Sequence, residues 1–257
     1  MKSYKYNISI RFYEELNDFL PKDLRKKNIN YSFNGRRSVK DLIEAIGVPH
    51  VEVDLILING KPVDFVYIVQ NEDRISVYPV FETLSIKGIS PLREKPLRDL
   101  KFVLDVHLTK LTKRMRLLGF DVNYKKNRDD SELAYISETE KRILLTRDIQ
   151  LLKRKIITRG LFIRNTDPDK QIIEVLEKFD LRNECRPFHR CINCNGEIHR
   201  LAFQKEINFI SHNVPEGVLD WCREFFICKS CKKIYWKGSH YEKLQKIIQR
   251  ILDNKNY

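Results

Sequence analysis

Two short apolar segments that each lead into an aspartate decide the fold: Phe102-Val103-Leu104-Asp105 and Ile143-Leu144-Leu145-Thr146-Arg147-Asp148. Each segment is typical of a buried strand, and the residues between them have helical periodicity. Strands that alternate with helices predict a parallel sheet, whose strands open at their carboxyl ends on one ligand-binding crevice. The sequence therefore predicts an α/β domain in which Asp105 and Asp148 face each other as paired ligands for a divalent metal.

Two further aspartates are candidates for the same site. Asp130 stands at the start of a helical segment, and Asp167 precedes a helix predicted over Ile172–Phe179. An aspartate before a helix is most often an N-cap, so both also have a purely structural interpretation. We predict Asp169 as the cap of the later helix and Asp167 as a cap, a turn residue or a ligand. Thr146 could orient a water molecule or a substrate phosphate.

The net charge of +13 falls on one part of the chain. Residues 1–85 hold equal numbers of basic and acidic residues, so the whole excess belongs to residues 86–257. A helix predicted over 108–118 has one apolar face and one basic face. Lysine and arginine neutralise phosphates without reading sequence, so these residues could follow a nucleic-acid backbone; the alternative is a solvated surface. The candidate contacts are Lys110, Lys113, Arg114, Arg116 and Arg147.

All six cysteines lie in the last third of the chain, and four of them form two C-x-x-C pairs. The pairs are Cys191 with Cys194 and Cys228 with Cys231. One pair alone could be a redox motif, but two pairs supply the four thiolates of a tetrahedral Zn²⁺ site. With all four positions filled by protein, the zinc is expected to be structural. Cys185 and Cys222 lie outside the pairs and are predicted to be ordinary buried thiols.

The first part of the chain has the pattern of a small β-grasp domain. Alternating apolar residues predict strands, Ser38 is placed to cap a short helix, and Asn59-Gly60 predicts a tight turn. The sequence resembles the sulfur-carrier branch of that fold, whose members end in a Gly-Gly pair. Here the final strand continues through Phe81-Glu82-Thr83-Leu84 without such a pair. A docking role toward a protein partner is therefore expected. Without a long apolar run or a signal peptide, we expect no membrane contact and a cytoplasmic location.

Three blocks identify a resemblance to a known family: FVLDVHLTKLTKRMRLLGFDV, DDSELAYIS with EKRILLTRDIQLLKR, and FIRNTDPDKQIIEVLEKFDL. They resemble the PIN-fold ribonuclease family related to the C-terminal domain of the Mut-seven exonuclease. Some members of that family carry a ubiquitin-like domain in front and a zinc ribbon behind. The resemblance implies that the carboxylates hold catalytic Mg²⁺ or Mn²⁺ and that RNA is the partner. The residues that match its acids are Asp105, Asp130, Asp148 and Asp167.

The predicted organisation is a ubiquitin-like β-grasp domain over 1–85, a linker over 86–98, a PIN-like α/β nuclease domain over 99–184, and a zinc ribbon with a C-terminal helix over 185–257. The predicted function is hydrolysis of RNA phosphodiesters by water at a carboxylate-held metal centre. The alternative is a catalytically inactive RNA-binding or adaptor protein that uses the same basic domain and the zinc ribbon.

Overall fold

The computed structural model describes residues 5–79, 92 and 100–253. Contacts between Cα atoms divide the chain into two compact units, one of residues 1–99 with 130–162 and one of residues 100–129 with 163–257. The predicted linker over 86–98 lies outside the described residues, apart from Leu92. The segment Phe81-Glu82-Thr83-Leu84 also lies outside them.

The N-terminal part of the first unit is a five-stranded mixed sheet in the order β2-β1-β5-β3-β4. β1 pairs antiparallel with β2 and parallel with β5, and β3 pairs antiparallel with both β5 and β4. This is the arrangement expected of a β-grasp domain. The strands are β1 (Lys5–Phe12), β2 (Ile29–Asn34), β3 (Val53–Ile58), β4 (Lys61–Val63) and β5 (Arg74–Pro79).

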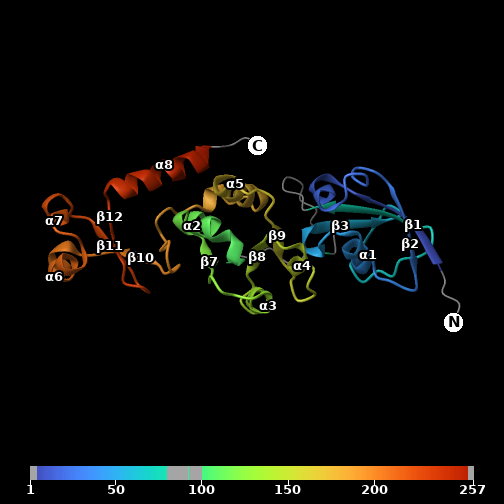
Figure 1. Cartoon of the computed structure of the whole chain (residues 1–257), viewed down its shortest axis with the longest axis horizontal. Coiled ribbons are helices and arrows are strands. Elements are labelled where there is room, and N and C mark those ends of the chain that lie inside the picture. Colours follow the sequence, from blue (N-terminus) through green and yellow to red (C-terminus); the bar gives the residue numbers. More distant parts are fainter. Residues whose placement is uncertain (1–4, 80–91, 93–99, 254–257) are drawn as a thin grey trace. The chain divides into compact units, whose positions relative to one another are not determined.

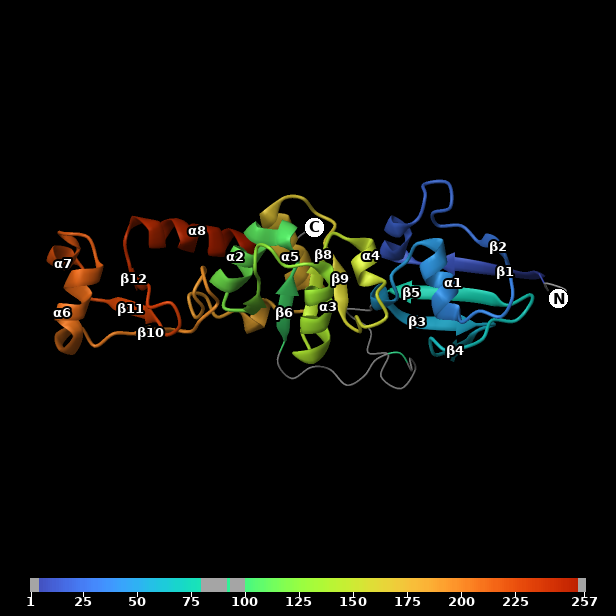
Figure 2. The same cartoon turned by 60° about the horizontal axis from the view of Figure 1, so that its bottom comes forward.

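One helix, α1 (Val39–Ile46), crosses a face of this sheet (Figure 2). Its start is fixed by a capping box in which the Ser38 side chain accepts from the Asp41 N–H and the Asp41 side chain accepts from the Ser38 N–H. It ends at Gly47, whose φ of 135° is open to glycine and strained for other residues. Two 3-10 turns complete the domain, η1 (Glu14–Phe19) and η2 (His50–Glu52).

The central part of the chain forms the predicted parallel sheet, with the strand order β7-β6-β8-β9. β6 is parallel to β7, and β8 is parallel to β9. Every residue of β8 is buried, as expected of a strand covered on both faces. The strands are β6 (Lys101–Leu104), β7 (Asp121–Asn123), β8 (Ile143–Thr146) and β9 (Gly160–Phe162). The helices between and after them are η3 (Val106–Leu108), α2 (Thr109–Leu117), α3 (Asp130–Thr139), α4 (Ile149–Leu152) and α5 (Pro168–Lys178).

The C-terminal part of the second unit is a three-stranded antiparallel sheet with helices around it. Its strands are β10 (Ile198–Arg200), β11 (Phe225–Cys228) and β12 (Ile234–Trp236), in the order β10-β11-β12. The helical elements are η4 (Arg182–Glu184), α6 (Phe203–Asn213), α7 (Val218–Trp221) and α8 (Ser239–Asp253).

A small apolar core that includes Phe225, Ile210 and Ile234 holds this C-terminal sheet and its helices together. The last helix, α8, contacts α5 (Figure 1). Across the described residues, no helix combines the length and the apolar character that crossing a bilayer requires.

Candidate metal centres

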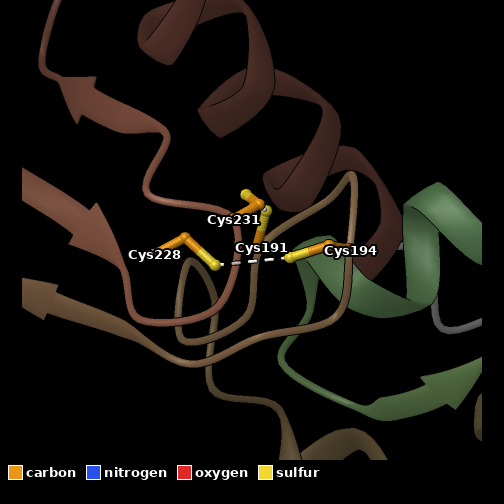
Figure 3. Close-up of side chains that lie close together, drawn as sticks. All are labelled: Cys191, Cys194, Cys228 and Cys231. Atoms are coloured by element: carbon orange, nitrogen blue, oxygen red, sulfur yellow. Dashed lines mark hydrogen bonds between the residues drawn. The ribbon is translucent and has the colours of Figure 1, made fainter. Parts of the chain in front are cut away.

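The four paired cysteines converge on one point (Figure 3). The Sγ atoms of Cys194 and Cys228 are 3.3 Å apart, those of Cys191 and Cys231 are 3.7 Å apart, and all four lie within 4.8 Å of one another. A zinc ion bound tetrahedrally by thiolates at about 2.3 Å sets its sulfur atoms about 3.8 Å apart, so the donor set fits such an ion. Among the described residues there is no second group of this kind.

The backbone around the cysteines is shaped to bring the two C-x-x-C loops together. Asn195 and Lys232 each adopt a positive φ, 72° and 62°, at equivalent places just after their pairs. A Cβ atom on Gly196 would lie 2.4 Å from Ser230 Oγ and 2.7 Å from Cys228 Sγ. Glycine at 196 therefore permits the close approach of the second loop, a role different from a positive-φ turn.

The pKa values of the thiols move in opposite directions. Burial works to raise the pKa of Cys191, but the Tyr235 hydroxyl at 2.9 Å and backbone N–H groups lower it to about 7. Burial raises the pKa of Cys194 to about 12, and the neighbouring Cys228 and Cys231 add to the rise. Four thiolates repel one another unless a cation lies among them, which is what a bound Zn²⁺ would supply.

The remaining cysteines do not join this cluster. Cys222 is buried and donates to the Glu224 carbonyl oxygen, and half-buried Cys185 donates to the Leu181 carbonyl oxygen. Burial raises the pKa of Cys185 to about 11, so this thiol stays protonated at neutral pH. Cys222 is buried as predicted, whereas Cys185 is only half-buried.

Arg116 departs from its prediction as a surface contact for nucleic acid. Its side chain is only 4% exposed. The guanidinium donates to the Val122 carbonyl oxygen from Nε and Nη2, and Nη1 donates to the carbonyl oxygens of Ile192 and Asn193. The last two residues lie inside the first C-x-x-C pair. Arg116 therefore fastens the first cysteine loop to α2 and β7.

Asn195 reinforces this attachment. Its side-chain oxygen accepts from the Val122 N–H at 2.9 Å, and its amide nitrogen donates to Asp121 at 2.9 Å. The Asp121 carboxylate also lies 3.6 Å from Arg190. The cysteine loop thus satisfies the outward-facing backbone of β7, the first strand in the sheet order.

The prediction of Asp169 as the cap of α5 is wrong, and the cap is Asp167, for which this was one of three predicted roles. Asp167 is the N-cap, since its Oδ1 accepts from the N–H groups of Asp169 and Lys170 at 2.9 and 3.0 Å. The Lys170 N–H lowers the pKa of Asp167 most, followed by that of Asp169, against the opposing effect of desolvation. Asp169, predicted as the cap, instead pairs with Arg114 at 2.9 Å and with Arg250. Arg114 is therefore held in an ion pair between α2 and α5 and is not a free basic side chain.

The Thr146-Arg147-Asp148 turn follows directly from β8. The Asp148 N–H donates to Thr146 Oγ1 at 2.9 Å, and Thr146 is fully buried. Asp148 Oδ1 accepts from the N–H groups of Gln150 and Leu151, so Asp148 caps α4. The Thr146 hydroxyl contributes to the geometry of the turn that presents Asp148.

The other two aspartates differ in exposure. Asp105 follows β6 directly and is 6% exposed, which is unusual for a carboxylate. Asp130 is the first residue of α3 and lies 3.4 Å from Arg154, with both side chains partly exposed. Asp105 belongs with Asp167 to the second unit, and Asp130 and Asp148 belong to the first.

Three of the predicted basic contacts remain on the surface. Lys110 and Lys113 are exposed on α2, and Arg147 is exposed in the turn after β8. Arg114 is partly buried in its ion pair and Arg116 is buried, so these two side chains are not exposed in the same way.

Comparison with known families adds an independent finding. A family model described as the Mut7-C RNAse domain matches residues 100–248, more than half of the 257 residues. The chain belongs to the Mut7-C RNAse family. A second model, described as the Mut7-C ubiquitin domain, matches residues 5–85 and identifies the N-terminal β-grasp domain as ubiquitin-like. Searches of curated proteins and of solved structures found no match for this Mut7-C chain.

Proposed function

We propose that the chain is a metal-dependent ribonuclease with a PIN-like catalytic domain. The observation that carries the proposal is the match of residues 100–248 to the Mut7-C RNAse domain. The parallel strands, with an aspartate just after β6 and another after β8, support it. The carboxyl ends of parallel strands are where α/β proteins bind their ligands, so the proposed centre lies at the ends of these two strands.

In this proposal Asp105, Asp130 and Asp148 would hold Mg²⁺ or Mn²⁺, and Asp167 would be a further acid of the centre. Mg²⁺ keeps several of its waters and takes few direct carboxylates, so some of these carboxylates would act through those waters. The bound ion would supply charge stabilisation for the attacking and leaving oxygens of the phosphodiester. The chain's own carboxylates orient the attacking water, and no covalent enzyme intermediate forms.

RNA is the proposed substrate, held through its backbone by Lys110, Lys113 and Arg147. These exposed side chains can neutralise phosphates without reading bases. Losing one such contact is expected to reduce the slope of log affinity against log salt by about 1. A cytoplasmic location fits the proposal, since reduced cysteines are what that compartment maintains.

The C-terminal module is proposed to be a structural zinc ribbon. The four convergent sulfur atoms and the Gly196 contact support this assignment. A site closed by four protein ligands leaves no position for a catalytic water. The zinc would hold the first cysteine loop in the shape that presents the Ile192 and Asn193 carbonyl oxygens to Arg116.

A second candidate function is an RNA-binding or adaptor protein without catalysis. The observation that favours it is the use of two candidate acids elsewhere: Asp167 caps α5, and Asp130 lies beside Arg154. Such a protein would bind RNA with the same salt dependence and release it intact.

Cleavage of a labelled pool of structured RNA separates the two functions. The zinc-loaded protein is incubated with Mg²⁺ or Mn²⁺, and wild type is compared with Asp105→Asn and Asp148→Asn, which remove charge but almost no volume. Metal-dependent cleavage that is lost in both variants supports the nuclease. Tight RNA binding without cleavage by wild type supports the adaptor, and cleavage that survives both substitutions contradicts the proposed centre.

A further inference from the structure

The ubiquitin-like domain contacts one segment of the α/β domain within the first unit. The contacted segment runs from the end of α4 through β9, and the contacts come from residues of α1 and η2. Three polar contacts join them. Lys153 Nζ donates to the Glu44 carbonyl oxygen at 2.7 Å, His50 Nε2 lies 2.8 Å from the Ile157 carbonyl oxygen, and the Phe162 N–H donates to Glu52 Oε1 at 2.6 Å.

His50 is a buried connector between the two domains, at 6% exposure. Its Nδ1 lies 2.6 Å from the Glu44 carboxylate, and its Nε2 faces the Ile157 carbonyl oxygen. Each ring nitrogen thus has an oxygen atom within hydrogen-bonding distance, one from α1 and one from the segment before β9.

Glu52 closes the edge of the parallel sheet. β9 is the last strand in the sheet order, and the N–H of its Phe162 goes to the Glu52 carboxylate instead of to a further strand. Glu52 is 1% exposed, so this carboxylate is committed to the protein interior. An uncovered edge strand invites pairing with other chains, and a buried acceptor prevents that pairing.

Apolar contacts also join the two domains. A Cβ atom on Gly160 would lie 3.5 Å from the Val51 side chain and 2.6 Å from that of Leu152, so glycine lets β9 approach both. The rings of Phe19 and Phe162 meet edge to face with centroids 5.4 Å apart. The contact between the domains therefore includes apolar packing as well as the three polar contacts.

We propose that the ubiquitin-like domain works on its own chain, as a brace that positions the Asp148 turn of the nuclease domain. α4 is a single turn that begins at its cap, Asp148, and is followed by Lys153, which the brace holds. A helix this short does not hold its shape in isolation, so its position depends on what fixes its two ends. His50, Glu52 and Lys153 are positioning residues: they act on the candidate metal ligand through α4 and β9.

The catalytic part of this inference rests on the proposed function, while the docking part does not. A partner protein that bound the same face would have to replace contacts that are already buried. The residues that a ubiquitin-like domain could offer to another protein here are thus occupied by the chain itself.

Hydrogen exchange on the full-length, zinc-loaded chain tests the docking. The variants are Glu52→Ala, Glu52→Gln, His50→Ala and Lys153→Met, with Asp23→Asn as a control on an exposed turn. We expect amides of residues 158–163 to exchange roughly tenfold faster in Glu52→Ala and His50→Ala, the change that loss of one hydrogen bond allows. Glu52→Gln keeps an acceptor oxygen and should retain protection. Asp23→Asn should match wild type.

Amides of the β1–β2 ladder report whether the ubiquitin-like fold is intact. His50→Ala or Glu52→Ala could also speed amide exchange in the β1–β2 ladder. In that case the exchange of Lys153→Met tests the docking, because this substitution alters only the nuclease side of the contact. Unchanged exchange over 150–163 in Lys153→Met and in Glu52→Ala would overturn the docking. Faster exchange there, with the β1–β2 ladder unchanged, supports it.

Mn²⁺ titration of the same proteins tests the positioning. We expect Glu52→Ala to weaken Mn²⁺ binding about tenfold, as removal of an outer support does at metal sites, and Glu52→Gln to recover it. Faster exchange with unchanged Mn²⁺ affinity would refute the positioning role and leave the docking standing. Wild type that binds no Mn²⁺ beyond its zinc site would refute the proposed function, while the exchange result would still decide the docking.

Discussion

Replacing Arg116 with methionine should detach the first cysteine loop from the α/β domain. The guanidinium makes hydrogen bonds to the carbonyl oxygens of Val122, Ile192 and Asn193, at 2.7 to 3.2 Å. Methionine keeps much of the apolar stem but leaves these carbonyl groups without their donor. Each hydrogen bond to a charged group contributes about 1.5–3 kcal/mol, and contributions within one network do not add fully. We expect a loss of about 3–5 kcal/mol in the free energy of unfolding.

The assay uses the placement of the tryptophans. The chain has two, Trp221 and Trp236, and both belong to the cysteine-bearing module. Their fluorescence during denaturant unfolding therefore reports the stability of that module. Zinc retention against a chelator gives a second readout, because the Arg116 contacts lie on the loop between Cys191 and Cys194.

Lys113→Met is the matched control on the same helix. Lys113 is exposed, so its replacement should change the unfolding free energy by no more than about 0.5 kcal/mol. It should instead weaken RNA binding and reduce the salt dependence. The reverse pattern, with Arg116→Met as stable as wild type and defective only in RNA binding, would refute the buried structural role of Arg116.

Two further predictions concern the cysteine site and the α5 cap. Gly196→Ala places a methyl group 2.4 Å from Ser230 Oγ and should speed zinc loss, since such overpacking costs about 1–3 kcal/mol; release to a chelator measures it. Asp167→Asn keeps a cap oxygen without the charge and should lower cleavage with a smaller drop in Tm than Asp167→Ala, which should lower both. Because the cap lowers the pKa of Asp167, its stabilisation is full above the unfolded pKa and is lost as pH falls through the folded value. Acid-range melting of wild type against Asp167→Asn checks that sign.

Local patterns predicted most of the elements. The Ser38 cap, the Asn59-Gly60 turn and the strands that precede Asp105 and Asp148 follow from short-range chemistry, and the structure has them. The prediction of Asp169 as the α5 cap is wrong, although the sequence holds the deciding signal. Pro168 occupies the first helical position, where proline is favoured, which makes the preceding Asp167 the cap.

Long-range contacts explain the residues whose roles the sequence did not reveal. Arg116 falls on the basic face of α2, and its burial depends on Ile192 and Asn193, more than seventy positions along the chain. The Asn195 side chain and the Tyr235 hydroxyl near Cys191 depend on the same packing. No local sequence pattern marks His50 as a contact between domains, because its partner Ile157 belongs to another domain. Periodicity identifies a buried face only when the covering element is known.

The most direct test of the proposed catalytic centre is whether Asp105 and Asp148 bind one ion together. Mn²⁺ affinity of the zinc-loaded protein is measured for wild type, Asp105→Asn, Asp148→Asn and the double variant. Two ligands of one ion are coupled, so the double variant should lose much less than the sum of the two single losses in binding free energy. Losses that simply add, or single variants that bind Mn²⁺ as wild type does, would contradict a shared metal centre.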